Sequence, residues 1–311
     1  MLSRRSVRIK VMQLLYAMES DKDLTFDKCK KRYWNMIDKS YDLFLFNIFN
    51  LIQITKVAID DEQKKKSKHL PTEEDKAFTA KFCENELIES LRDNAALNKI
   101  FEKKGFSASS DRDHFKKIYY EFAKEPAYIE YLKQESTNES HTNVLLELYR
   151  FCRRSELFNE IINDAYLNWI DDKSLAIGSV KKVIKALPVE GINFLNVYYP
   201  DDQTVKEFGE ELLERTHEGE NALLKLIKPV LKNWDHERLA VIDMILLKMA
   251  TSEMLEFPTI PTKVTLNEYV EIAKLYSTDK SKEFVNGVLD KLMKQLEEGG
   301  KINKKGRGLV D

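Results

Sequence analysis

Three arginines and a lysine gather at the start of the chain, where their side chains could bind phosphate groups. Arg4 and Arg8 are four residues apart, so on a helix their guanidinium groups project from the same face, with Arg5 and Lys10 beside them. Guanidinium groups suit phosphates and base edges better than ammonium groups do. Cations are not stabilised at the positive end of a helix dipole, and no nearby acid offsets this cost. The cluster therefore indicates a site for an anionic partner, with a solvated helix end as the alternative.

No pattern typical of an enzyme accompanies this cluster. The chain has no glycine-rich phosphate loop and no Ser/His/Asp spacing, and its five histidines are scattered among polar neighbours. Cys29, Cys83 and Cys152 lie far apart without metal-ligand spacing, which fits a reducing cytoplasm. The sequence predicts a cytoplasmic protein that is not an enzyme, with no catalytic residues, no metal and no cofactor.

The composition favours a helical protein without a strong overall charge. The 311 residues include 50 basic and 52 acidic side chains, so the net charge is −2 and any binding of nucleic acid must come from a local patch. Ten glycines and seven prolines are few for this length, and long alternating apolar and polar runs are absent. The most apolar stretch, Tyr41 to Val57, is interrupted by polar residues, so we expect a buried helix there and no membrane span.

The C-terminal part of the chain has the pattern of three amphipathic helices separated by breaks. Apolar residues recur at helical spacing from Leu239 to Met249, and Pro258 and Pro261 then end that helix. Thr265-Leu-Asn-Glu268 has the spacing of a capping box, and a final apolar stripe runs from Val285 to Leu296. This spacing alone predicts a small helical bundle.

Two segments at opposite ends of the chain resemble the NusB family of bacterial transcription antitermination factors. Lys263-Val-Thr-Leu-Asn-Glu268 follows a proline turn and precedes Phe284-Val-Asn-Gly-Val-Leu-Asp290, as in that family. At the other end, the arginine cluster is followed by Gln13-Leu-Leu-Tyr16, which is similar to the family's first helix. Because both matches occur in the family's order, the sequence is identified as a member of the NusB family.

The resemblance implies an all-α fold, a NusB-like helical bundle with an additional helical segment inserted after the first helix. Residues 1–20 would form the first helix with its arginine-rich start, residues 201–296 the helical core, and residues 297–311 a flexible basic tail. Residues 21–200 would be a helical insertion of unknown role. A degenerate repeat of the parent fold within this segment is an alternative that the sequence leaves open.

The resemblance also implies a site for RNA. In the NusB family, the arginine-rich start and the Phe-Val-Asn-Gly helix hold the single-stranded boxA element of nascent RNA. Matched position nominates Arg4, Arg5 and Arg8 as phosphate and base contacts. It nominates Phe284 as a stacking contact, since single-stranded RNA is read by stacking on aromatic rings, and Asn286 as a further contact.

The loop before this helix departs from the family pattern. Lys280 stands where the family often carries an acid, which would favour RNA by removing repulsion. Glu283 stands where the family often carries a lysine, which would work against RNA. We therefore include Lys280 among the RNA-binding candidates and expect the contact geometry of this loop to differ from the family's.

A second family surface binds NusE, the ribosomal protein that doubles as an elongation factor. The matched positions are Tyr16, an apolar ring with a hydroxyl group, and Asp243, a carboxylate for basic groups of the partner. Asp243 interrupts an apolar run, so we expect it on an exposed face. Glu253, which precedes Met254 and Leu255, is interpreted as structural.

The function that the resemblance implies is that of an adaptor. It would bind boxA-type single-stranded RNA with NusE, join the transcription elongation complex and support processive transcription of ribosomal RNA operons. The alternative is a NusB-fold protein-interaction module whose insertion masks or replaces the RNA-binding role. An RNA methyltransferase with a NusB-like amino-terminal domain would require a downstream cofactor-binding α/β domain, which this sequence does not hold.

Overall fold

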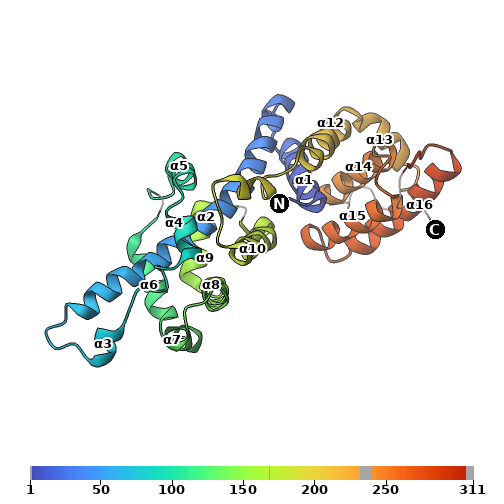
Figure 1. The fold of residues 1–311 in the computed structure, drawn as a ribbon. Coiled ribbons are helices and arrows are strands. Elements are labelled where there is room, and N and C mark those ends of the chain that lie inside the picture. Colours follow the sequence, from blue (N-terminus) through green and yellow to red (C-terminus); the bar gives the residue numbers. More distant parts are fainter. Residues whose placement is uncertain (1, 109, 168, 232–239, 306–311) are drawn as a thin grey trace. The chain divides into compact units, whose positions relative to one another are not determined.

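The computed structural model describes residues 2–108, 110–167, 169–231 and 240–305, and the regular structure in these ranges is helical throughout (Figure 1). The prediction of an all-α protein is confirmed. The described chain forms two compact units, one made by residues 38–199 and the other by residues 2–37 together with residues from 200 onward. Each unit is described by itself below.

The second unit contains the chain's first helix and its C-terminal helices. α1 (Arg4–Ser20) begins at Ser3, whose Oγ accepts a hydrogen bond from the Ser6 amide at 3.2 Å, as a helix cap does. The later helices are α11 (Asp202–Thr204), the π-helical turn η2 (Val205–Glu210), α12 (Glu211–Glu218), α13 (Glu220–Ile227), α14 (Val241–Glu256), α15 (Thr262–Tyr276) and α16 (Ser281–Glu298).

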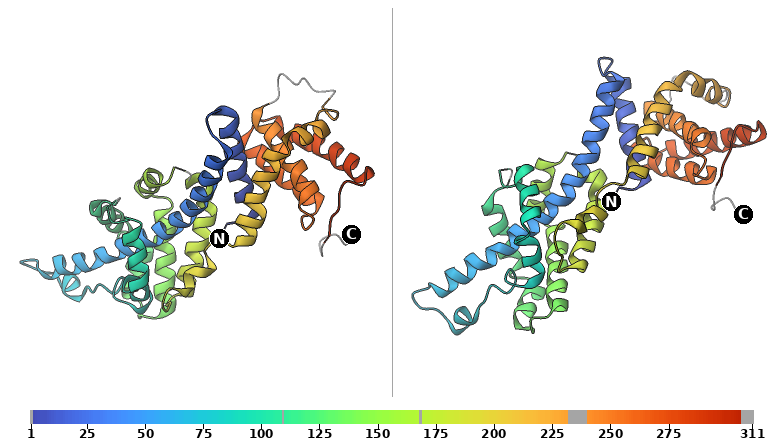
Figure 2. Two further views of the ribbon diagram at one scale, coloured as in Figure 1. Left: turned by 90° about the horizontal axis from the view of Figure 1, so that it is seen from above. Right: turned by 45° about the horizontal axis from the view of Figure 1, so that its top comes forward.

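α14 is the central helix of this unit. It packs against α1, α12, α13, α15 and α16, and Figures 1 and 2 show α14, α15 and α16 side by side. Every residue from Ile245 to Met254 is buried, the charged ones included. A helix enclosed in this way has no solvent-facing side over those turns, so its polar side chains need partners inside the protein.

The first turns of α2 (Phe26–Lys66) also belong to the second unit. The Tyr33 hydroxyl donates to the carbonyl of Val205 at 2.6 Å, and Trp34 Nε1 donates to Glu210 at 3.2 Å. These contacts hold residues 26–37 against η2, whereas the sequence-based division begins the insertion at residue 21.

Gly209 allows η2 to approach the neighbouring helices. A Cβ atom at this position would lie 2.0 Å from the Tyr33 hydroxyl oxygen and 2.3 Å from Val7 Cγ1. Such separations are well below van der Waals contact, so a larger residue here would force α1 and α2 away from η2.

The first unit is built around the remaining turns of α2. Phe46 and Phe49 of this helix pack against the ring of Phe106, with centroids 5.2 and 5.7 Å apart. The other helices are α3 (Glu73–Ala77), α4 (Glu86–Arg92), α5 (Ala95–Lys103), α6 (Arg112–Phe122), α7 (Pro126–Lys133), α8 (Asn138–Cys152), α9 (Glu156–Ala165), α10 (Trp169–Ala186) and the 3-10 turn η1 (Asn193–Val197).

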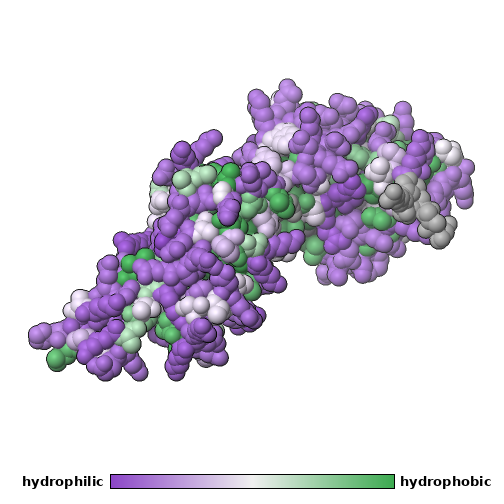
Figure 3. Space-filling view, in the orientation of Figure 1, coloured by the Kyte–Doolittle hydropathy of each residue, from purple (hydrophilic) through white to green (hydrophobic). Residues whose placement is uncertain are grey.

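The apolar stretch of α2 is a core helix. By length and composition α2 could cross a membrane, but 83% of its most apolar window is buried inside the protein, as in the core of a soluble protein. The expected buried helix at Tyr41–Val57 is therefore confirmed. On the face drawn in Figure 3, hydrophilic side chains dominate the surface of both units, which agrees with an interior that holds the aromatic residues.

Candidate nucleic-acid interface

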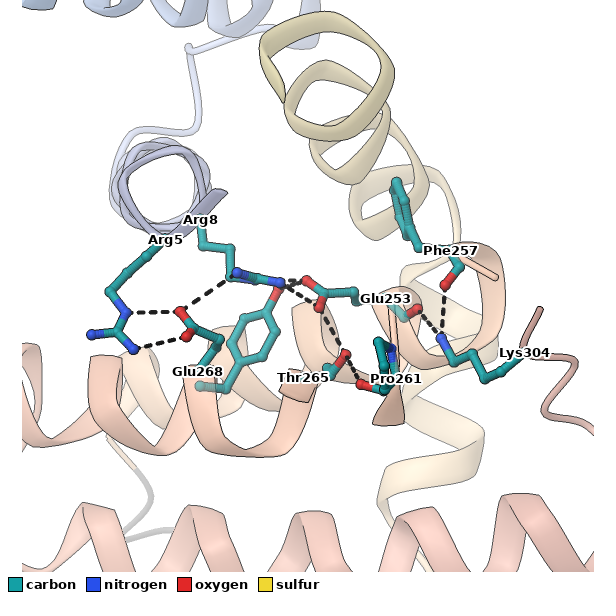
Figure 4. Close-up of polar contacts among 9 residues, drawn as sticks. Arg5, Arg8, Glu253, Phe257, Pro261, Thr265, Glu268 and Lys304 are labelled. Atoms are coloured by element: carbon teal, nitrogen blue, oxygen red, sulfur yellow. Dashed lines mark hydrogen bonds and ion pairs between the residues drawn. The ribbon is translucent and has the colours of Figure 1, made fainter. Parts of the chain in front are cut away.

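Arg8 does not face solvent but lies inside the second unit. Its side chain is 2% exposed, and it donates to Glu253 of α14 through Nε at 2.8 Å and Nη2 at 2.7 Å (Figure 4). Burial opposes the charged guanidinium group, but the hydrogen bonds and the charge of Glu253 outweigh it, so the pKa of Arg8 is raised above its usual value. Lys10 is buried as well.

Glu253 is fully satisfied in this interior position. Besides the two bonds from Arg8, its carboxylate accepts hydrogen bonds from the hydroxyls of Thr265 at 2.8 Å and Tyr269 at 3.1 Å. The guanidinium group of Arg8 also lies 5.0 Å from the ring centroid of Phe208. The structural interpretation of Glu253 is confirmed. Arg8 is not presented at the surface as the resemblance implied, because its side chain is buried against Glu253, with Nη1 3.6 Å from an oxygen of Glu268.

The predicted capping box at Thr265 is also wrong. α15 begins three residues earlier, at Thr262 after Pro261. Thr265 then lies one turn inside the helix and turns its hydroxyl to Glu253, while the carboxylate of Glu268 bonds Arg5 instead of the helix start (Figure 4).

Arg5 forms the outer ion pair of the same helix start. Its Nε and Nη2 each lie 2.7 Å from an oxygen of Glu268, in a two-bond fork. These hydrogen bonds from Arg5 hold the pKa of Glu268 below its usual value. The Arg5 side chain is 46% exposed, so part of its guanidinium group is open to a ligand.

Arg4 completes the outer rim. Its side chain is half-buried, and its guanidinium carbon lies 5.6 Å from the centre of the Phe208 ring. The start of α1 therefore presents two accessible cations, Arg4 and Arg5, above the buried cation of Arg8.

The first turns of α16 carry the other RNA-binding candidates. Lys280 and Asn286 are exposed, and so is Glu283, which keeps an acid beside them. Phe284 is 6% exposed and belongs to the core with Val285, so its ring is not available at the surface for stacking, in contrast to the expectation.

The two candidates for NusE lie in different surroundings. Tyr16 is exposed on α1. Asp243 is 4% exposed, and its carboxylate accepts hydrogen bonds from Ser277 Oγ at 2.6 Å and Ser281 Oγ at 2.7 Å. The expectation of an exposed Asp243 is wrong, because two serines between α15 and α16 satisfy the carboxylate and allow it to be buried.

The C-terminal residues contribute a contact that sequence analysis missed. Lys304 Nζ donates to the carbonyls of Glu253 at 3.0 Å and Phe257 at 2.8 Å, which caps the end of α14 with a cation. Burial lowers the pKa of Lys304 to about 8. The Lys305 amide donates to the Pro258 carbonyl at 2.8 Å. Lys304 and Lys305, which fall in the segment expected to be a flexible basic tail, are thus bonded to the end of α14 and the residues after it, and residues 306–311 lie outside the described ranges.

Sequence analysis had partial signals for these contacts. Glu253 in an apolar run indicated a buried acid in need of a partner. The partner, Arg8, lies 245 residues away, which no local pattern reveals. The pairing of Arg5 with Glu268 could not be predicted for the same reason, since these residues are 263 positions apart. Within the described ranges, no group of three or more His, Cys, Asp or Glu side chains could hold a metal ion.

Comparisons with known proteins agree on one family. The family model described as "NusB family" matches residues 189–294. A transcription antitermination protein NusB from Salinibacter ruber is 42% identical over 110 residues, which cover 35% of this chain and 69% of that protein. The protein of the same name from Chloroherpeton thalassium is 51% identical over 79 residues, which cover 25% of this chain and 37% of that protein. A third, from Natranaerobius thermophilus, is 38% identical over 92 residues, which cover 30% of this chain and 66% of that protein.

A solved structure titled "T. maritima NusB, P3121, Form 2" is 24% identical, covers 52% of this chain and 94% of its own, and gives a TM-score of 0.29. That score is too low to support an argument from shape, so the assignment depends on sequence. The Salinibacter ruber relative matches over more than two thirds of its length at well above 30% identity. The chain therefore belongs to the NusB family.

Proposed function

We propose that this protein is a transcription antitermination factor that binds boxA-type single-stranded RNA together with NusE. It would act in the cytoplasm as an adaptor that tethers leader RNA to the elongation complex and supports processive transcription of ribosomal RNA operons, without turning over a substrate. The observation that carries the proposal is the match to relatives named transcription antitermination protein, 42% identical over 110 residues in the first case.

The RNA contacts in this proposal are the candidates that reach the surface, wholly or in part. Arg4 and Arg5 offer guanidinium groups to phosphates at the start of α1, and Lys280 and Asn286 offer an ammonium and an amide group at the start of α16. Such contacts release counterions from the RNA, so binding should weaken as salt rises. Arg8 supports the site from below by tying α1 to α14.

Tyr16 is the proposed contact for NusE. An exposed ring with a hydroxyl group can bury apolar area and still donate a hydrogen bond, which is why tyrosine suits protein interfaces. The buried Asp243 positions the junction of α15 and α16 through Ser277 and Ser281 in this account, rather than touching the partner.

Residues 38–199 are proposed to be a helical insertion in the family fold. They form a compact unit of their own, and the family match covers residues 189–294, almost entirely beyond that unit. Their role would be additional to the RNA-binding function.

The alternative is a NusB-fold interaction module in which the insertion replaces the RNA-binding role. One observation favours it: two of the three arginines at the start of α1 are paired with acids of the same chain, Glu253 and Glu268. The helix start therefore carries less free positive charge than its sequence indicates.

Fluorescence anisotropy of a labelled boxA-type RNA, with and without NusE, tests the proposal against the alternative. We expect salt-sensitive binding that NusE tightens and that an Arg4→Ala/Arg5→Ala variant loses. A Lys291→Ala/Lys294→Ala variant, which removes the same charge from exposed positions later on α16, serves as the matched control. No binding by the native protein at low salt, with or without NusE, would support the interaction module instead.

A further inference from the structure

A groove beside the end of α14 has features of a binding site that the proposed function does not use. Its volume is about 290 Å³, and it lies between the α12–α13 hairpin and the last turns of α14. The floor is apolar, with Ala222 and Leu226 of α13 facing Leu255 of α14. Other lining residues are Arg215, Glu218, Gly219, Leu223, Ser252 and Glu256.

Ser252 gives this groove an unmet hydrogen-bonding group. The residue is 1% exposed and lines the groove, and its Oγ has no hydrogen-bond partner among the described residues. Buried hydroxyls are normally satisfied, and an unsatisfied one lowers stability. An occupant that brings a peptide N–H or C=O group into the groove would satisfy it.

The rim of the groove favours an occupant with a positive charge. Glu218 and Glu256 are both exposed there. The one cation among the described lining residues, Arg215, is shared between Glu211 at 3.1 Å and Glu256 at 4.0 Å, so the two acids of the rim are not fully balanced. The groove thus combines an apolar floor with an excess of acid. A segment with an apolar side chain next to a basic one matches both features.

The residues that follow Lys305 in the sequence have this composition. After Lys305 come Gly306-Arg-Gly-Leu-Val-Asp311, in which Arg307 precedes Leu309 and Val310. The Lys305 amide is fixed to the Pro258 carbonyl, two residues beyond Glu256 at the rim. Four extended residues span about 13 Å, which exceeds the roughly 10–12 Å width of a helix with its side chains, so the stretch from Lys305 to Leu309 is long enough to cross α14.

We propose that the groove binds the chain's own C-terminal segment, residues 307–310. Leu309 and Val310 cover the apolar floor, and Arg307 faces the acids of the rim. A peptide group of the segment bonds Ser252 Oγ. This segment lies beyond residues 189–294, so the device is an addition to the part of the chain that matches the family. The proposal is independent of RNA binding.

Cysteine cross-linking in the full-length protein tests this placement. The native cysteines Cys29, Cys83 and Cys152 are buried, so introduced ones react selectively. An Ala222→Cys/Val310→Cys variant places one cysteine in the groove, and an Asn221→Cys/Val310→Cys variant places it at the adjacent exposed position outside the groove. We expect the first pair to form an intramolecular disulfide under mild oxidation about tenfold faster than the second, because docking raises the local concentration of the segment.

A second change separates docking from chance encounter. Adding Leu309→Asp to the Ala222→Cys/Val310→Cys variant should slow cross-linking to the rate of the Asn221→Cys control. Equal rates for the two cysteine pairs, or no effect of Leu309→Asp, would overturn the proposal. Disulfide-linked dimers in place of the intramolecular link would also overturn it, since the segment would then occupy a second copy.

Discussion

The Arg8–Glu253 pair and the Arg5–Glu268 pair both begin on α1 and have nearly the same bond lengths, but they lie in different surroundings. Arg8 is 2% exposed and its partner is completely buried, whereas Arg5 is 46% exposed. The inner pair fixes α1 to α14, and the outer pair leaves a cation within reach of a ligand. Burial, more than residue type or spacing, decides which arginine of the cluster is structural and which can bind.

The same contrast sets the expected energies. Removing one partner of a buried pair leaves an uncompensated charge in the interior and costs about 3–5 kcal/mol. An exposed pair contributes about 0–1 kcal/mol. Mutations at the Arg8–Glu253 pair should therefore lower the unfolding free energy much more than mutations at the Arg5–Glu268 pair.

The largest effect should come from Glu253→Ala. The change removes the acceptor for Arg8, Thr265 and Tyr269 together, so we expect the unit formed by residues 2–37 and 200 onward to lose about 3–5 kcal/mol of unfolding free energy. Urea denaturation combined with hydrogen exchange of α14 peptides would measure it. An Arg8→Met/Glu253→Met variant, which buries no charge, should recover much of the loss. A loss below 1 kcal/mol for Glu253→Ala would contradict an interior role for the pair.

Gly209→Ala should have the next largest effect. The added Cβ would overlap the Tyr33 hydroxyl and Val7, so α1 and α2 must shift, at a cost of about 1–3 kcal/mol. Because Val7 adjoins Arg8, the inner pair should loosen as well. Thermal unfolding followed by circular dichroism checks this. Gly287→Ala on α16, where an added Cβ meets nothing within 4 Å, is the control and should be as stable as the native protein or more so.

The smallest loss of stability should come from breaking the Arg5–Glu268 pair, and this loss should depend on pH. The Arg5 hydrogen bonds lower the pKa of Glu268 from its usual 4.5. The unfolded carboxyl therefore takes up its proton at a higher pH than the folded one. The contribution of the pair is complete above about pH 4.5 and is lost as the pH falls through the folded pKa.

The Glu268→Gln variant should thus lose at most about 1 kcal/mol at pH 7 and show a shallower fall in stability below pH 4.5. Urea titrations at a series of pH values compare it with the native protein. If the unfolding free energy of the variant fell with decreasing pH as it does in the native protein, Arg5 would not stabilise the ionised form of Glu268 in solution.

The sequence revealed the fold class and the family because those depend on local pattern. Helical spacing and the Lys-Val-Thr-Leu-Asn-Glu and Phe-Val-Asn-Gly segments are readable along the chain. The exposure of a side chain cannot be read from local pattern, because it depends on partners far away in the sequence. Asp243 is buried only because Ser277 and Ser281, 34 and 38 residues later, satisfy it.

The dependence of exposure on distant partners also explains why some site residues were assigned wrongly from the sequence. Periodicity shows that one face of a helix is apolar, but α14 is enclosed by five other helices and has no free face for a polar residue to occupy. Arg8 faces this interior, as does Phe284, whereas Arg4 and Arg5 remain accessible at the rim. Matched position in a family motif therefore identified the region of the site but not the residues that reach its surface.

The RNA affinity of the Glu268→Gln variant tests the central claim most directly, namely that Arg5, unlike the buried Arg8, can bind RNA although it is paired with an acid of the same chain. Anisotropy titrations with a boxA-type RNA over a range of salt concentrations should show tighter binding than the native protein, because Arg5 is released from its carboxylate. Freeing Arg5 from its competing carboxylate should steepen the salt dependence by at most about 0.7 in logarithmic slope, the value for one full phosphate contact on single-stranded RNA. Unchanged or weaker binding with an unchanged slope would contradict the assignment of Arg5 to RNA.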